Sequence, residues 1–338
     1  MNLMVLELGK EYPLAGEDKL IDILLASLSQ DLDDKGQPML RQQHPKSHGL
    51  VKGEFIVDSN LPEDLKIGVF QREKYDVLIR FSNGSNKRKD GHLQSDMVGD
   101  ARGIAIKLLN VGQNNNEQDF VGINHPVMFI KDIKGYLDFG LVQKGMVEGK
   151  VILKPGEPPQ VDDEFREPFQ ASAYAFGILK EIAAKATTSP LDIIYWSTTP
   201  YKLGEKAIKY QMVPHQTQTF NPQNAQDQDN YLREGIKQYL QKREAYFDFK
   251  IQFQTDADKM LIEDPTIEWK ESDSPFIKVA TIKIFQQEFD TAEVKQQDES
   301  LSFSPWHCLP EHRPLGGVNR ARNKIYTQLS EKRKLDSH

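Results

Sequence analysis

The sequence of 338 residues is short of cysteine and of long apolar runs, and both shortages limit what the protein can be. Its only cysteine, Cys308, cannot form a disulfide within the chain, so nothing calls for an oxidising compartment. No stretch reaches the roughly 18 consecutive apolar residues of a membrane helix, so no membrane span is expected. The start, MNLMVLELGKEYPLAGEDKL, lacks the basic and apolar regions of a signal peptide, so a cytoplasmic location is expected.

Positive charge is not in excess either. The net charge is −7 at pH 7, which argues against general binding of nucleic acid or anionic membranes. Hydrophobic residues make up 38% and charged residues 28%, as in an ordinary soluble protein. The chain also has no glycine-rich phosphate loop in a strand–helix context and no GxSxG, HExxH or CxxC motif. These absences exclude the commonest nucleotide-binding, hydrolase and zinc-protease patterns.

The hydrophobic patterns that are present predict a protein built on a sheet, with helices at both ends. Residues 18–32, DKLIDILLASLSQDL, have apolar side chains at helical spacing and predict an amphipathic helix. Short β-rich runs follow: GLVKGEFIV, YDVLIRFSNGS, RGIAIKLLNV and QDFVGINHPVMFI. Asn83-Gly84 is a tight-turn signal, and Pro126 favours an edge or a bend. These runs predict a meandering antiparallel sheet, and we expect it to close into a barrel.

The second half mixes helices and strands. A long helix is expected over residues 165–186 and another within NYLREGIKQYLQKREAYF, while residues 215–229 predict an exposed loop. The stretches KAIKYQMVP, YFDFKIQFQ and PFIKVATIKIF alternate or are β-rich and predict further strands. No repeat of solenoid or propeller type is present. The expected fold class is therefore α+β, one domain built on an antiparallel barrel with flanking helices.

The last helix, RNKIYTQLSEKR, places a tyrosine between two arginines. Arg322, Tyr326 and Arg333 fall on one face, because a helix turns about 100° per residue. Two fixed positive charges favour the ionised phenol, which would suit ferric iron as a ligand. The other interpretation is a solvated helix with a half-buried tyrosine.

Two further stretches carry candidate functional residues. Arg41, His44 and His48 lie in RQQHPKSHG before a strand, and histidine is the side chain best suited to move protons near neutral pH. Polar surface is the alternative, and Pro45 and Gly49 make a helical metal-binding pair of the two histidines a poor fit. Arg80 stands in an apolar strand, where an unpaired charge would be costly.

Arg80 therefore needs an anion, either an internal carboxylate such as Asp100 or the carboxylate of a ligand. Downstream, the run DFVGINHPVMFIKD contains four residues that could line an apolar pocket: Asn124, His125, Met128 and Phe129. The alternative for this run is an ordinary sheet core.

Taken in order, these stretches resemble the haem catalase family from about residue 35 to the end. RQQHPKSHG is similar to the family's segment in which an arginine precedes the distal histidine by three residues. RFS, DARGIAIK and DFVGINHPVMFIKD are similar to its RFS, RGFA(I/V)K and VGNNTP(I/V)FF(I/V)RD runs, and DPTIEW, PFIKVATIKI and LSFSPWHCLP follow in the family's order. The closing RNKIYTQLSEKR resembles its RxxxY element.

The resemblance implies a catalase-like barrel that binds ferric haem b. Residues 1–34 would form an N-terminal helical segment and residues 35–338 a single haem-binding domain. Tyr326 would be the iron ligand, His44 the distal acid–base group and Asn124 a second catalytic residue. Further residues would contact the haem, the arginines at positions 41, 80 and 333 through its propionates: Arg41, Arg80, Phe129, Tyr136, Arg322 and Arg333.

The sequence departs from the family pattern in the distal pocket. Ile123 stands where the family has its first asparagine, so Asn124 would replace that asparagine only through a slip or bulge of the strand. Met128 replaces a distal phenylalanine. The implied activity is decomposition of hydrogen peroxide or of an organic hydroperoxide, and the alternative is a haem-binding protein without catalysis. The expected partner is this small molecule, and a homo-oligomer, with a dimer favoured, is also expected.

Overall fold

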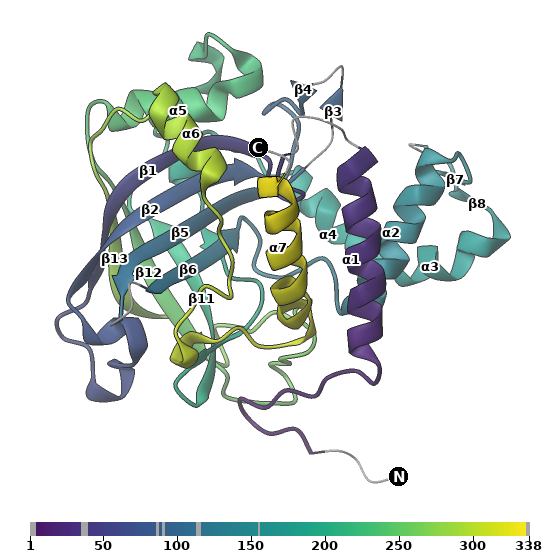
Figure 1. The fold of residues 1–338 in the computed structure, drawn as a ribbon, viewed down its shortest axis with the longest axis horizontal. Coiled ribbons are helices and arrows are strands. Elements are labelled where there is room, and N and C mark those ends of the chain that lie inside the picture. Colours follow the sequence, from purple (N-terminus) through teal and green to yellow (C-terminus); the bar gives the residue numbers. More distant parts are fainter. Residues whose placement is uncertain are drawn as a thin grey trace.

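The computed structural model describes residues 5–34, 40–85, 88–89, 92–112, 116–154 and 156–335. Its main sheet has nine strands in the order β10-β11-β12-β13-β1-β2-β5-β6-β9, and β11 also pairs with β9. This pairing closes eight strands into an antiparallel barrel, and β10 extends β11 as a hairpin (Figure 1). The barrel strands are β1 (Lys46–Val57), β2 (Lys74–Asn83), β5 (Arg102–Val111), β6 (Asn116–Ile123), β9 (Tyr195–Trp196), β11 (Lys206–Pro214), β12 (Ala245–Phe253) and β13 (Ile277–Ile284), with β10 at Tyr201–Leu203.

Two short ribbons and several helices lie outside the barrel. The ribbons are β3 (Arg88–Lys89) with β4 (His92–Leu93), and β7 (Val151–Ile152) with β8 (Gln160–Val161). The helices are α1 (Glu17–Asp34), α2 (Ile133–Val147), α3 (Arg166–Ala171), α4 (Ala173–Ala183), α5 (Tyr231–Leu240), α6 (Ala292–Ser300) and α7 (Gly317–Leu335). Figure 1 shows α7 beside the barrel with α1 next to it, and α2, α3, β7 and β8 farther out. No helix among the described residues is both long and apolar enough to cross a membrane.

Aromatic rings fill the barrel interior. The ring centroids of Phe120 and Phe249 lie 4.8 Å apart, and those of Phe55 and Phe249 lie 5.2 Å apart. All three rings are buried, and each comes from a strand whose inward side chains alternate with outward ones. The lumen is therefore a packed core, and a ligand site must lie outside it.

The predicted α+β barrel is confirmed, and most of the predicted strands are present. Two local predictions were wrong. Asn83-Gly84 does not join two neighbouring strands as a tight hairpin, because β2 pairs with β5 and the amide of Gly84 donates to the carbonyl of Ala101 over 2.7 Å. The helix expected over residues 165–186 is divided at Ser172 into α3 and α4. Helices α2 and α6 were not predicted.

Candidate functional site

The backbone of His44 has an unusual conformation just before β1. Its φ angle is 57°, in the left-handed region that residues other than glycine rarely adopt. Its amide donates to the carbonyl of Gly84 over 3.3 Å, and its own carbonyl accepts from Nη1 of Arg80 over 3.0 Å. These two hydrogen bonds hold His44 across the end of β2. A strained backbone, as the positive φ angle of His44 indicates, is typical of functional sites.

The imidazole of His44 is held on two sides. Its Nδ1 atom lies 3.0 Å from the Oγ atom of Ser82, and its ring lies against Gly103, where an added Cβ would come within 2.5 Å of it. Burial, followed by the positive charges of Arg80 and Arg322, lowers the pKa of His44 to about 3. The ring is therefore neutral near pH 7, and its Nε2 atom makes no hydrogen bond to any described residue.

The strand register fixes which side chain shares the face of the His44 ring. Ser82 pairs with Gly103, and Gly103 pairs with Ile123. Directly paired residues point to one face of a sheet, so the aliphatic Ile123 is on the same face as Ser82 and the His44 ring. The pairing runs without a shift from Gly103–Ile123 to Leu108–Gln118. The slip that would put Asn124 in the place of Ile123 does not occur.

Asn124 instead forms hydrogen bonds with the backbone of the neighbouring strand β5. Its Oδ1 atom accepts from the amide of Arg102 over 3.0 Å, and its amide donates to the carbonyl of Arg102 over 3.0 Å. The side chain is buried. The structure thus gives Asn124 a role at the end of β6, and its predicted catalytic role stays a prediction.

Three predicted arginines meet at the C-terminal end of α6. Nε of Arg80 donates to Oδ1 of Asp298 over 2.7 Å. Nη2 of Arg41 donates to the carbonyls of Asp298 and Leu301 over 2.5 and 2.8 Å. Nη2 of Arg333 donates to the same Leu301 carbonyl over 3.2 Å. The last carbonyls of a helix carry partial negative charge, which favours guanidinium groups there. We call Arg41, Arg80 and Arg333 the arginine cluster.

Asp298 is the internal carboxylate that Arg80 needs, so the suggestion of Asp100 was wrong. Asp100 accepts from the amides of Ser85 and Ala101 over 2.9 and 2.7 Å. Asp298 comes from α6, more than 200 positions further along the chain. One Arg80 atom, Nη2, is buried and has no hydrogen-bond partner among the described residues. A buried guanidinium nitrogen without a partner can accept a further anion.

On α7, Arg322 lies among tyrosines. Its Nη1 atom donates to Oγ1 of Thr199 and Oδ1 of Asn319 over 3.3 and 3.2 Å. Burial alone would lower the pKa of Arg322, but nearby tyrosine hydroxyls, with Tyr326 first among them, raise it above its ordinary value. Arg322 therefore remains a cation beside the Tyr326 phenol.

The predicted aromatic residues Phe129 and Tyr136 lie near one another, with ring centroids 6.5 Å apart. Tyr136 belongs to the apolar cluster that contains Tyr326 and the inner side chains of α1. Burial, with a smaller effect of Tyr326, raises the pKa of Tyr136 to about 12, so its hydroxyl stays protonated. Phe129, Tyr136 and Tyr326 therefore come together from the β6–α2 connection, α2 and α7.

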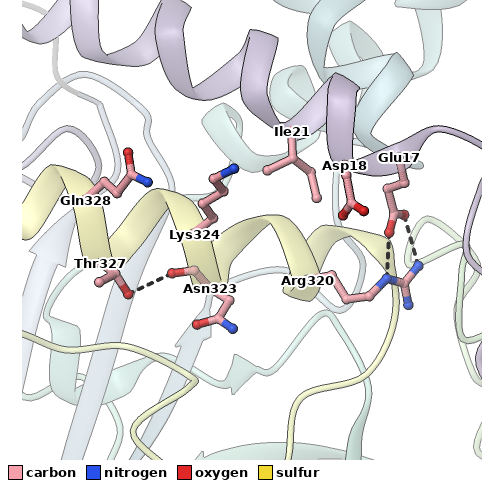
Figure 2. Close-up of a pocket in the computed structure, with 8 residues that line it drawn as sticks. All are labelled: Glu17, Asp18, Ile21, Arg320, Asn323, Lys324, Thr327 and Gln328. Atoms are coloured by element: carbon pink, nitrogen blue, oxygen red, sulfur yellow. Dashed lines mark hydrogen bonds and ion pairs between the residues drawn. The ribbon is translucent and has the colours of Figure 1, made fainter.

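The opposite face of α7 borders a polar groove against α1. Figure 2 shows Arg320 facing Glu17 there, and Nε of Arg320 donates to Glu17 over 2.6 Å. The groove is lined by Glu17, Asp18, Ile21, Arg320, Asn323, Lys324, Thr327 and Gln328. Helical spacing puts its α7 residues on the side away from Arg322, Tyr326 and Arg333. The groove is therefore separate from the candidate site.

Two other polar clusters serve the fold. His48 is buried, and its Nε2 atom lies 2.7 Å from Oδ1 of Asn83, so the structure does not place it with His44 as a metal pair. Glu117, Asp119 and His307 have the spacing of metal ligands. Nζ of Lys107 already lies among them, 2.5 Å from Glu117 and 2.9 Å from Asp119. This cluster is an ion-pair network.

Two residues of the candidate site, Ser82 and Asp298, were not predicted from the sequence. Ser82 could have been found, because it lies two positions from Arg80 in one strand and the two side chains share a face. A serine and an arginine on one face of an apolar strand are a usable signal. No comparable sequence signal marks Asp298, because it stands in the polar run QQDES and only the fold brings it to Arg80.

Comparisons with known proteins agree on one family. A sequence model of the family described as Catalase matches residues 15–151. A search of curated proteins finds no match to this chain. Among solved structures, a fungal catalase has a TM-score of 0.67 at 19% identity, and the alignment covers 98% of this chain and 66% of that one.

Two further solved catalases give the same result. Catalase A from Saccharomyces cerevisiae has a TM-score of 0.66 at 20% identity, covering 98% of this chain and 68% of the yeast protein. A bacterial catalase has a TM-score of 0.65 at 18% identity, covering 98% and 63%. This chain thus spans about two thirds of the length of these catalases. At such identities the likeness establishes the fold.

Proposed function

We propose that this chain, whose residues 15–151 match the Catalase family model and whose fold is similar to that of solved catalases, is a haem-dependent enzyme that decomposes peroxides. The observation that carries the proposal is the fixed, neutral imidazole of His44. One ring nitrogen faces Ser82 and the other is left to act on a substrate. A neutral imidazole with one nitrogen anchored and the other without a protein partner can take up a proton and return it.

The residues present fit ferric haem b as the cofactor. The arginine cluster has a buried nitrogen without a partner, Nη2 of Arg80, which suits a propionate oxygen. Tyr326 would ligate the iron, since a phenolate is an established haem ligand, and the cation Arg322 is close enough to interact with its oxygen. When bound, haem supplies the iron at which the O–O bond of a peroxide is cleaved heterolytically.

The protein's own part in this reaction falls to His44. Its Nε2 atom would take a proton from one peroxide oxygen and return it to the departing oxygen. Ser82 fixes the orientation of the ring, and the absence of a side chain at Gly103 leaves space for it. Phe129 and Tyr136 would pack against the cofactor.

The substrate can be hydrogen peroxide or an organic hydroperoxide. Ile123 adds an aliphatic surface on the face of the His44 ring, and Met128 is buried in an apolar cluster against which Phe129 packs. An apolar pocket lowers the cost of binding an alkyl chain. We therefore favour an organic hydroperoxide, which would be turned over faster than hydrogen peroxide at equal concentration.

A second candidate is a haem-binding protein without catalysis, for haem storage or sensing. Ile123 is the observation in its favour, because an isoleucine cannot hydrogen-bond a peroxide. A carrier would need Tyr326 and the arginine cluster and would have no use for His44. His44→Ala should abolish peroxide turnover and leave haem bound if the protein is an enzyme, and should change neither if it is a carrier.

The absorption spectrum of the purified protein, with haemin added if it is isolated without cofactor, tests the shared part of both candidates. We expect a high-spin ferric spectrum that shifts or collapses in Tyr326→Phe. Phenylalanine retains the ring and lacks the oxygen, so it is a close steric match. A spectrum unaffected by Tyr326→Phe, or no specific spectrum, would remove the haem site and the function with it.

A further inference from the structure

Asp298 is the carboxylate at the centre of the arginine cluster. It is 4% exposed, with Oδ1 2.7 Å from Nε of Arg80 and 3.8 Å from Nη2 of Arg41. Its neighbour Glu299 has a half-exposed side chain and lies 3.5 and 3.7 Å from Arg41 and Arg333. One buried and one half-exposed carboxylate thus face three guanidinium groups.

The charges of the cluster do not balance in its interior. Burial, together with repulsion by Arg80 and Arg333, lowers the pKa of Arg41 to about 9. Burial likewise lowers the pKa of Arg333. Without Asp298, the three neighbouring cations would lose their buried counter-charge in the described part of the chain, and the remaining carboxylate of Glu299 is half-exposed. The buried carboxylate is therefore needed to hold the cluster together when no ligand is present.

Asp298 also acts against an incoming anion, because it carries the same sign of charge as a ligand carboxylate. We propose that Asp298 is a positioning residue that holds the arginine cluster in place before the cofactor binds and restricts its affinity for cofactor carboxylates. This inference rests on the proposed haem-binding function. It predicts that removing the charge of Asp298 has opposite effects on stability and on carboxylate affinity.

Asp298→Asn separates charge from shape. Asparagine keeps an oxygen that can accept from Nε of Arg80, so the geometry of the cluster is largely retained. The unliganded protein loses its buried counter-charge and should unfold at a lower temperature. The positive potential at the free nitrogen of Arg80 should rise at the same time.

The experiment compares two probes on the protein without cofactor. Haemin carries two carboxylates, and iron protoporphyrin IX dimethyl ester has the same ring with both carboxylates esterified. The ratio of their affinities measures the contribution of the carboxylates. In Asp298→Asn we expect this ratio to rise about tenfold over wild type, together with a lower unfolding temperature of the unliganded protein.

Glu299→Gln is the matched control. It removes the same charge from the next residue, whose side chain is 52% exposed and therefore screened by solvent. The affinity ratio should change by less than about threefold in this variant. An equal rise in both variants would mean a general charge effect and would overturn the role of Asp298.

The remaining outcomes also distinguish failure of the proposed function from failure of this inference. If wild type binds neither probe, the proposed function fails and the inference falls with it. If wild type prefers haemin and Asp298→Asn leaves the ratio unchanged, only the inference fails. If Asp298→Asn does not fold alone, refolding with haemin should rescue it and the dimethyl ester should not. Rescue by both probes, or by neither, contradicts the proposal.

Discussion

Gly103 lies against the imidazole of His44, so closely that a methyl group in place of its hydrogen would come within 2.5 Å of Nδ1 and Cε1. The close approach also places Nδ1 of His44 3.0 Å from Oγ of Ser82. Gly103 has no unusual φ angle, so its small size is what the site requires. The position of the His44 ring therefore depends on the absence of a side chain at Gly103 in β5 as well as on the hydrogen-bonding partner Ser82 in β2.

Gly103→Ala should lower peroxide turnover about a hundredfold, because the new methyl group pushes the imidazole out of its position. Haem binding should be retained, since Tyr326 and the arginine cluster are untouched. Gly140→Ala is the control, because a Cβ there meets nothing within 4 Å. Steady-state kinetics and the haem spectrum measure both effects. Unchanged turnover in Gly103→Ala would argue against His44 as the acid–base group.

Ile123→Asn should increase turnover of hydrogen peroxide about tenfold. The residue is paired with Gly103 on the face of the His44 ring, so an amide there can hydrogen-bond a small peroxide. Turnover of a bulky alkyl hydroperoxide should fall, because apolar surface is lost. The ratio of kcat/KM for the two substrates measures the change. A ratio equal to that of wild type would mean that position 123 does not contact substrate.

Lys107→Met should destabilise the protein by about 3–5 kcal/mol. Lys107 is 1% exposed and pairs with the fully buried Asp119, which would lose its buried cationic partner. The control is Lys66→Met, whose partner Glu63 is 87% exposed, with an expected cost below about 1 kcal/mol. Denaturant unfolding gives both values. Equal costs would mean that water reaches the Lys107 pair.

Stability should fall as the pH falls from about 6.5 toward 4. Burial lowers the pKa of His48 and of His312 to about 4, from an ordinary value of 6.5. In this interval the unfolded chain binds protons that the folded chain does not, and each fully buried histidine accounts for roughly 3 kcal/mol.

Unfolding free energies measured at several pH values check this dependence. In His312→Gln the slope should correspond to about one proton fewer, while stability at pH 7 also decreases. The reason for the loss at pH 7 is that Nε2 of His312 accepts from the amide of Val69 over 2.9 Å. A flat profile in wild type would contradict the burial of these two rings as neutral groups.

Much of the fold could be predicted from local patterns. Alternation in YFDFKIQFQ and KAIKYQMVP predicts strands, because one face of each is the barrel interior. Helix α2 was missed since its glycines and mixed polarity, in IKGYLDFGLVQKGMV, weaken the helical pattern. Strand order and closure depend on pairings such as β11 with β9, which no local pattern specifies.

The residues of the candidate site were likewise predictable only in part. His44, Tyr326 and the arginines could be named from residue type, spacing and family resemblance. The register that puts Ile123 rather than Asn124 beside the His44 ring is a property of the sheet, and it required the structure. Asp298 could not be found because its contact with Arg80 joins residues that the sequence separates by 218 positions.

The docking of α1 on α7 makes the site depend on the order of synthesis. Side chains of α1, including Ile21 and Leu24, pack with Ile325 and Leu329 of α7, and Arg320 pairs with Glu17 across 303 positions of sequence. During translation α1 leaves the ribosome before α7, and its apolar face has no α7 to cover it until α7 is made. The candidate site therefore cannot form before α7 is synthesised, and a nascent chain stalled before residue 317 would expose an aggregation-prone helix.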